Sequence, residues 1–237
     1  MVKLLTFDLW ETIIIDEGEG ESARDRLRAE FIIKTLGLLP GIKQDILSFF
    51  DELVAAFKNP VQENDWSILP ETQLDYLFRK LSVNVNKGEF ESIYKYYTEV
   101  ILDFQPALTE PIVPDVLREL KKSYLIGLIS NTGRTPGRVL LTLLERLKIK
   151  EYFDFYVFSD EILMRKPDPR VFQIALNKAQ VLPEETVHIG DSYRMDYVGA
   201  KNVQINAILY APGALLPQGE PFVRSFQEIP EALKKLW

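Results

Sequence analysis

Hydrophobic and polar positions follow two different patterns along the chain, and the pattern changes near residues 16 and 107. Residues 2–7 form a short, nearly continuous apolar run, which is typical of a buried strand in a parallel sheet. Between the two changes, apolar side chains recur three and four positions apart, as on one face of a helix. This spacing predicts helices over 22–36, 42–57, 71–81 and 87–104.

Two segments interrupt these patterns and mark boundaries. Residues 16–20 contain two glycines, and residues 105–111 contain two prolines, which disfavour the interiors of helices and strands. We interpret these segments as paired hinges around an inserted helical domain.

Strand and helix patterns alternate after the second hinge. Strands are predicted over 124–130, 155–159, 186–190 and 205–210, and helices over 113–122, 136–147, 169–179, 193–202 and from 230 onward. This alternation is typical of a parallel sheet with covering helices. The predicted fold is therefore α/β: a Rossmann-like parallel core with helices on both faces, formed by 1–15 and 107–237, and a helical cap, 16–106, inserted after the first strand.

Polar residues follow four segments of the predicted core. Asp8 ends the first strand, Ser130-Asn131-Thr132-Gly133 ends the second, Lys166-Pro167-Asp168-Pro169 follows the third, and Gly190-Asp191-Ser192 ends the fourth, with Asp196 nearby. Ligands in open parallel sheets bind beyond the carboxyl ends of the strands, so we expect these residues to form one site. Taken alone, Asp8 fits a turn former equally well.

Composition narrows the class of function. The chain has 237 residues, 46% of them hydrophobic, which is enough for a sizeable core. A net charge of -7 opposes binding to nucleic acid, and the absence of cysteine excludes disulfides, thiolate metal sites and a cysteine nucleophile. The sequence shows no signal-peptide pattern and no apolar run near the roughly 18 residues of a membrane span. We expect a cytoplasmic protein, monomeric or homodimeric, that acts on a small molecule and binds no membrane.

The four polar segments resemble the motifs of the haloacid dehalogenase superfamily. They stand here as Asp8-x-Trp10-x-Thr12, Ser130-Asn131, Lys166-Pro167-Asp168-Pro169 and Gly190-Asp191-Ser192-x-x-x-Asp196, in the superfamily's order. The helical insert also lies where that superfamily carries its cap. The resemblance implies that Asp8 is a nucleophile and that Ser130 and Lys166 stabilise a transferring phosphoryl group. Further candidates for contact with substrate are Trp10, Thr12, Asn131 and Thr132.

The aspartates of these motifs imply a metal. Asp8, Asp191 and Asp196 in one cleft would repel by roughly 4 kcal/mol per pair at 4 Å and an effective dielectric near 20, so they need a cation. Mg²⁺ prefers oxygen ligands and bridges to phosphate oxygens. By resemblance, its ligands are the carboxylate of Asp8, the backbone carbonyl of Trp10 and Asp191, with Asp196 binding directly or through a metal-bound water.

Trp10 departs from the phosphatase pattern. Phosphatases of the superfamily usually have a second Asp there, which serves as general acid and then as general base, and an indole can do neither. Glu11 is adjacent, but an offset of one residue generally aims a side chain elsewhere. General acid–base catalysis contributes about 100- to 10,000-fold. We therefore expect a slow Mg²⁺-dependent phosphatase of small phosphate monoesters, or one that favours good leaving groups.

Two other functions stay open. The 2-haloacid dehalogenases of the superfamily also place an aromatic residue at the position of Trp10 and use no metal, whereas Asp191 and Asp196 resemble the metal-binding phosphatase form. A phosphate-binding regulatory protein without turnover is the third possibility, and Trp10 alone supports it.

Several other charged or polar residues have simpler interpretations. His188, the one histidine, lies inside an apolar strand and is expected to be a core residue with a satisfied ring nitrogen. Arg24, Arg26 and Arg28 are expected to form a solvated helix face. Arg134 follows the second motif, where it could meet an anionic substrate or lie on the surface.

Overall fold

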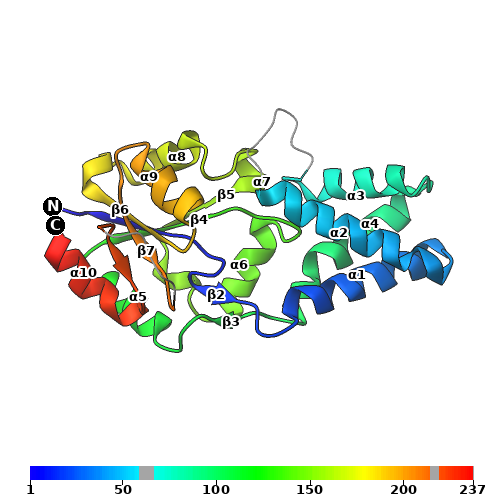
Figure 1. The fold of residues 1–237 in the computed structure, drawn as a ribbon, viewed down its shortest axis with the longest axis horizontal. Coiled ribbons are helices and arrows are strands. Elements are labelled where there is room, and N and C mark those ends of the chain that lie inside the picture. The colour runs from blue at the N-terminus through cyan, green and yellow to red at the C-terminus, as the bar shows by residue number, and fades with distance from the viewer. Residues whose placement is uncertain (59–66, 214–218, 237) are drawn as a thin grey trace. The chain divides into compact units, whose positions relative to one another are not determined.

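The computed structural model describes residues 1–58, 67–213 and 219–236 (Figure 1). They form two compact units. The sheet unit comprises Met1–Ile15, Ala107–Asn131 and Leu144–Trp237, and the helical unit comprises Asp16–Pro106 and Thr132–Leu143. The predicted core and cap have the same breaks after residues 15 and 106. Residues 132–143, which we expected in the core, group with the helical unit instead, and the division into a core and a cap stays a prediction.

A six-stranded parallel sheet forms the centre of the sheet unit, in the order β5-β4-β1-β6-β7-β8. Each strand is short and mostly buried, as strands covered on both faces are. The central strand β1 pairs with β4 and β6, so that Phe7 lies opposite Leu128 and Ile189. This arrangement confirms the predicted α/β fold class. The strands are β1 (Leu4–Phe7), β4 (Leu125–Ser130), β5 (Phe155–Phe158), β6 (Thr186–Gly190), β7 (Asn206–Tyr210) and β8 (Phe222–Val223).

Helices surround this sheet (Figure 1). Thr6 and Phe7 point to opposite faces because side chains alternate along a strand. Thr6 contacts His188, whose ring packs on Phe172 of α8, while Phe7 stacks on Phe226 near the C-terminal helix. Apolar cores therefore lie on both faces. The helices that lie wholly in the sheet unit are α5 (Val113–Leu120), α7 (Ser159–Ile162), α8 (Pro169–Ala179), α9 (Gly199–Lys201) and α10 (Ile229–Leu236).

Several elements, α7 and β8 among them, differ from the sequence prediction. The helix predicted over 193–202 is a π-helical segment, Tyr193–Val198, followed by α9. β2 (Ile14–Ile15) and β3 (Ala107–Leu108) form an antiparallel pair where the chain leaves and re-enters the sheet unit. Two-residue strands are too short to show a periodic pattern, so the sequence did not reveal them.

The helical unit contains the four helices that were predicted. α4 begins with a capping box in which the Asn86 side chain accepts from the Glu89 backbone and Glu89 accepts from the Asn86 N–H. α4 ends at Glu99, earlier than predicted, and Phe104 beyond it is 49% exposed. The helices are α1 (Gly20–Leu36), α2 (Lys43–Lys58), α3 (Pro70–Lys80) and α4 (Lys87–Glu99), with α6 (Gly137–Arg146) lying largely in this unit.

The arginines of α1 correct one expectation. Arg24 and Arg28 are each only 1% exposed, so the predicted solvated face is wrong for both, whereas Arg26 is exposed and pairs with Glu19. Carboxylates within the unit neutralise the two buried guanidinium groups, which is the condition for burying a charge. Arg24 pairs with Asp16 and Glu21, and Arg28 pairs with Glu21 and Asp25.

Arg134 explains why residues 132–143 group with the helical unit. Its guanidinium lies 2.7 Å from Glu21 and 3.1 Å from Asp25, and it also donates to the backbone carbonyl of Phe50. The side chain is 9% exposed, so of the two alternatives left open, contact with substrate or a surface position, the second is wrong. Among the described residues, no helix combines the length and apolar character needed to cross a bilayer.

Candidate active site

Asp8 stands directly beyond the central strand, and the local chain path fixes it there. Its backbone N–H donates to the Ile189 carbonyl at 2.9 Å, which extends the pairing of β1 with β6 by one residue. The N–H groups of Ile13 and Ile14 then both donate to the Leu9 carbonyl, so the chain turns back immediately after Asp8. The Asp8 residue is 7% exposed. The position of β1 inside the sheet therefore places the Asp8 carboxylate at the carboxyl ends of the strands, as predicted.

Lys166 joins two of the aspartates. Its Nζ lies 2.5 Å from Asp8 Oδ1 and 2.6 Å from Asp196 Oδ1, and the side chain is 2% exposed. Asn131 fixes the backbone of Lys166 from both sides: its Oδ1 accepts from the Lys166 N–H at 2.8 Å, and its Nδ2 donates to the Lys166 carbonyl at 3.0 Å. Asn131 therefore orients the lysine, and its expected contact with substrate stays a prediction.

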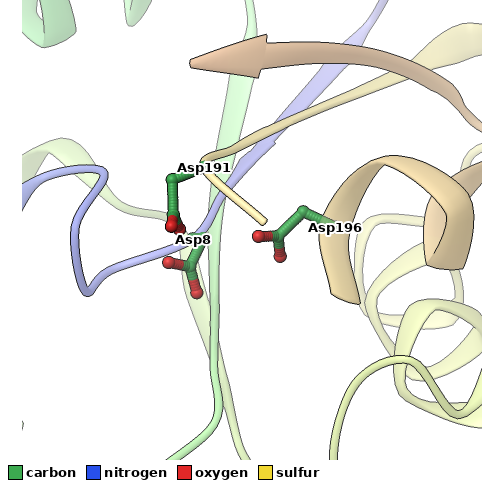
Figure 2. Close-up of side chains that lie close together, drawn as sticks. All are labelled: Asp8, Asp191 and Asp196. Atoms are coloured by element: carbon green, nitrogen blue, oxygen red, sulfur yellow. The ribbon is translucent and has the colours of Figure 1, made fainter. Parts of the chain in front are cut away.

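Figure 2 shows the carboxylates of Asp8, Asp191 and Asp196 close together. Each offers an oxygen within 4.8 Å of an oxygen of the others. Asp191 follows β6 directly, as Asp8 follows β1, so the register of the two parallel strands brings both side chains to the same edge of the sheet. Thr12 Oγ1 lies 3.4 Å from Asp8 Oδ2 and 3.4 Å from Asp191 Oδ1. The sequence predicted this cluster correctly.

Asp196 is bonded on both carboxylate oxygens. Oδ1 accepts from Lys166 and lies 3.1 Å from His188 Nε2, and Oδ2 accepts from the Ser192 backbone N–H at 3.0 Å. A side chain at Gly190 could not coexist with it, since a Cβ there would lie 2.4 Å from Asp196 Cγ. The glycine before Asp191 is therefore needed for space. With its oxygens occupied by protein donors, Asp196 is held in one orientation.

Burial and like charges shift the pKa values of these carboxyls apart. Burial raises the pKa of Asp8 to about 7, Lys166 opposes that rise, and the charges of Asp196 and Asp191 add to it. Burial also raises the pKa of Asp191 to about 6, with Asp196 adding to the rise. Burial alone would raise the pKa of Asp196, but Lys166 and His188 together hold it well below its usual value.

The donor set fits a divalent cation. The cluster has three carboxylates and one ammonium group, so when all are ionised the side chains of Asp8, Asp191, Asp196 and Lys166 sum to a charge of -2. Buried charge of one sign needs a partner of the other sign. Hard carboxylate oxygens are the ligands that Mg²⁺ prefers. Asp8 and Asp191 are the side chains that would hold the ion, with the predicted contributions of the Trp10 carbonyl and Asp196.

The remaining predicted residues lie in different surroundings. Ser130 ends β4 and is 1% exposed, and Trp10 is partly buried in the turn after Asp8. Thr132 is fully buried and groups with the helical unit.

Sequence reasoning missed the contacts of Thr6 and His188 with this site. His188 is buried in β6 as expected, but it contacts Asp196 as well as Thr6. The available signal was positional. Each residue lies two positions before a site residue, Asp8 or Gly190, so the period of a strand places both on the same face as those residues.

Comparisons with known proteins agree with the motifs. The sequence profile described as haloacid dehalogenase-like hydrolase matches residues 37–210, which is most of the chain. Haloacid dehalogenase-like hydrolase domain-containing protein 3 of Bos taurus is 41% identical over 91 residues, a match that covers 38% of this chain and only 35% of that protein. The glyceraldehyde 3-phosphate phosphatase of Pyrococcus furiosus is 27% identical over 214 residues, which cover 90% of this chain and 82% of that enzyme.

Solved structures show the same fold. A 2-haloacid dehalogenase from Pseudomonas syringae pv. Tomato DC3000 superposes with a TM-score of 0.73 at 22% identity, covering 100% of both chains. A phosphatase of the same superfamily from Thermococcus onnurineus has a TM-score of 0.68 at 20% identity, covering 98% of both chains. These two neighbours bear on fold alone, since they carry different activities on one architecture. The profile match, which spans most of the chain, shows that the chain belongs to the haloacid dehalogenase-like hydrolase family.

Proposed function

We propose that this hydrolase is a Mg²⁺-dependent phosphatase that cleaves small phosphate monoesters through an aspartyl phosphate on Asp8. The observation that carries the proposal is the excess negative charge of the cluster formed by Asp8, Asp191 and Asp196. An anionic substrate can approach such a cluster only when a cation compensates it. The phosphatase from Pyrococcus furiosus, which matches 90% of this chain, supports the same assignment.

The proposed reaction has two steps, formation of the aspartyl phosphate and its hydrolysis. An Asp8 oxygen attacks phosphorus, the bond from phosphorus to the leaving oxygen breaks, and the alcohol departs after taking a proton from solvent. Water then attacks the phosphorus of the acyl phosphate, which releases inorganic phosphate and restores the Asp8 carboxylate. Lys166, 2.5 Å from Asp8 Oδ1, offsets the charge of the phosphoryl group, and the Ser130 hydroxyl is available to hold its oxygens. A bound Mg²⁺ supplies further charge neutralisation.

Trp10 determines which substrates should react well. It occupies the position of the usual acid and base, and an indole donates no proton to a leaving oxygen. The neighbouring Glu11 has a backbone φ of 57°, and its charge contributes to the raised pKa of Asp191. We therefore expect p-nitrophenyl phosphate, which has a good leaving group, to react at least about 100-fold faster than an alkyl phosphate such as β-glycerophosphate.

The decisive experiment measures hydrolysis of p-nitrophenyl phosphate by the purified chain with and without Mg²⁺. We expect activity only with the metal, and a loss of at least about 1,000-fold in Asp8→Asn, which keeps the side chain's shape but removes the nucleophile. The matched control is Asp115→Asn, an exposed aspartate on α5 that pairs with Arg118 and should keep wild-type activity. An Asp8→Asn variant with wild-type turnover would contradict the proposal.

Dehalogenation is the second candidate, because Trp10 matches the aromatic residue of the dehalogenase motif. It would displace chloride from 2-chloropropionate without metal, and the resulting ester on Asp8 would be hydrolysed at its carboxyl carbon. In H₂¹⁸O that route labels Asp8, whereas attack of water on phosphorus labels the released phosphate. If the chain shows no activity in either assay, a phosphate-binding protein without turnover would be favoured.

Location and assembly belong to the same proposal. The absence of cysteine supports the expected cytoplasmic location, and the expected monomer or homodimer is tested by light scattering of the purified chain.

A further inference from the structure

A chain of polar contacts runs beneath the carboxylate cluster into the core of the sheet unit. His188 is fully buried in β6. Its Nδ1 lies 2.9 Å from Thr6 Oγ1 on the neighbouring strand, and its Nε2 lies 3.1 Å from Asp196 Oδ1. The same Asp196 oxygen lies 2.6 Å from Lys166 Nζ, which reaches Asp8. Thr6 and Asp8 therefore lie at the two ends of one chain of hydrogen bonds.

The donors and acceptors of this chain allow one consistent proton arrangement for a neutral imidazole. An ionised Asp196 carboxylate only accepts hydrogen bonds, so His188 Nε2 must carry the proton that it shares with Asp196. Nδ1 then has a lone pair, and the Thr6 hydroxyl must donate to it. Thr6 therefore selects the tautomer of His188 that donates to Asp196.

Packing alone does not account for a histidine at this position. The ring lies edge-on to Phe172, at 5.2 Å between centroids, in a strand whose neighbours Val187 and Ile189 are apolar and fully buried. An aliphatic side chain would fill such a space without a polar atom to satisfy. A buried imidazole is tolerated because both nitrogens are bonded, and one of those bonds ends on a residue of the catalytic cluster.

We infer that His188 is a positioning residue, whose Nε2–H orients the Asp196 carboxylate so that Lys166 stays on Asp8 Oδ1. This inference rests on the proposed function of Asp8 as the nucleophile. Asp196 Oδ2 is fixed by the Ser192 N–H, and His188 fixes Oδ1, so the two donors together set the plane of the carboxylate. Lys166 Nζ lies 2.6 Å from the same Oδ1. Without His188 the carboxylate can rotate, and the ammonium is no longer held between two fixed oxygens.

The kinetic test compares His188→Leu, which keeps volume but removes the donor, with His188→Gln, whose amide N–H can replace Nε2–H. For p-nitrophenyl phosphate with saturating Mg²⁺, we expect His188→Leu to lower kcat about 10- to 100-fold with KM changed less than about threefold, as loss of a supporting hydrogen bond does at metal sites. His188→Gln should recover most of that loss. Thr6→Val, which lets the tautomer change, should fall between the two.

A control variant separates positioning from packing. Phe172→Leu removes the ring that packs on His188 and should lower Tm without lowering kcat. The inference is overturned if His188→Leu keeps wild-type kcat, or if Phe172→Leu and His188→Leu lower kcat equally. If His188→Leu fails to fold, His188→Gln and Thr6→Val still give the comparison.

A spectroscopic test is independent of turnover, because the chain contains a single histidine. Labelling with ¹⁵N-histidine gives one imidazole spin system, which we expect to show protonated Nε2 and unprotonated Nδ1. Asp196→Asn and Asp8→Asn should both shift the Nε2 resonance. An Nδ1-protonated ring, or an Nε2 resonance unmoved by either variant, would overturn the inference. A wild-type chain that is inert toward phosphate esters would contradict the proposed function alone, and the resonance would still decide the role of His188.

Discussion

Two charge clusters, one in each unit, differ in their balance of positive and negative charge. In the helical-unit cluster, Arg24, Arg28 and Arg134 pair with Asp16, Glu21 and Asp25, so the formal charges cancel. The sheet-unit cluster contains one cation, Lys166, which pairs with Asp8 and Asp196, and a third carboxylate, Asp191, so the ionised cluster has an excess of two negative charges. A balanced cluster is complete within the protein, whereas the unbalanced cluster needs a ligand.

The pKa values of Glu21 and Asp8 reflect the same contrast, although not every carboxyl follows it, since burial also raises the pKa of Asp25 in the helical-unit cluster. Burial opposes the ionisation of Glu21, yet Arg28, Arg134 and Arg24 lower the pKa of Glu21 to about 2. In the sheet-unit cluster, burial prevails and raises the pKa of Asp8 to about 7. Removing a charge should therefore have opposite effects on stability in the two clusters.

The largest expected effect comes from Asp191→Asn. Loss of a metal ligand should reduce hydrolysis of p-nitrophenyl phosphate by at least about 1,000-fold, since the cation then lacks one of its charged ligands. The same variant should raise the Tm of the metal-free protein at pH 8, because it removes an uncompensated charge. Steady-state kinetics and thermal unfolding in EDTA check the two results. If the variant had a lower Tm than the wild type in EDTA, the cluster would carry no excess negative charge.

The next largest effect is expected from Arg134→Met, which should lower the stability of the protein. It leaves Asp25 and Glu21 with less positive charge in a buried site, which costs about 3 kcal/mol of the free energy of unfolding. For a chain of this size, that corresponds to a fall in Tm of about 6–12 °C. Urea unfolding of the wild type and the variant measures the difference. Unchanged stability would mean that Arg134 contributes little to the helical unit.

A smaller effect is expected from pH on the metal-free protein. The folded-state pKa values of Asp8 and Asp191 are raised to about 7 and about 6, from ordinary values near 4. Below pH 4 both carboxyls are neutral in the folded and in the unfolded state, so neither lowers the stability of the fold there. As pH rises through 6 and 7 they ionise in the folded state, and that stability is lost. Between pH 5 and pH 8 in EDTA, Tm should fall by at least about 2–4 °C, equivalent to about 1 kcal/mol.

Saturating Mg²⁺ is the control for that pH dependence. It should remove most of the fall in Tm, since the ion compensates the ionised carboxylates. A Tm that rises from pH 5 to pH 8 in EDTA would contradict the raised pKa values.

Arg26→Met should have the smallest effect and serves as the matched control for Arg134→Met. Arg26 lies on the same helix as Arg24 and Arg28, but its pair with Glu19 is exposed at both ends. Exposed pairs contribute between zero and about 1 kcal/mol, so we expect a change below about 0.5 kcal/mol in urea unfolding. A loss comparable to that of Arg134→Met would show that burial does not separate the two arginines.

The sequence predicted the parts of the fold that depend on local patterns. The limits of β6 were predicted to the residue, and Asp8 and Asp191 were placed together because parallel strands bring their carboxyl ends to one edge. The burial of Arg24 and Arg28 was not predictable in the same way. Their spacing on α1 fits a solvated face, but tertiary contacts bury them. Arg24 donates to the Phe104 carbonyl, 80 residues away, and Arg28 donates to the Tyr97 carbonyl, 69 residues away.

Two features of the site also lay beyond local patterns. The amide of Asn131 spans the backbone of Lys166, a contact that depends on how two loops meet. The link from His188 to Asp196 depends on the π-helical segment after β6, where the sequence predicted an ordinary helix. Both are contacts between segments whose relative placement no periodicity encodes.

The central claim is that the cluster of Asp8, Asp191 and Asp196 is completed by a divalent cation. Isothermal titration calorimetry of the metal-free chain with Mg²⁺ at pH 8 tests it most directly, with Asp191→Asn as the comparison. We predict saturable binding of one ion per chain in the wild type and loss of that binding in Asp191→Asn. No saturable heat in the wild type, or equal binding by both proteins, would contradict the claim.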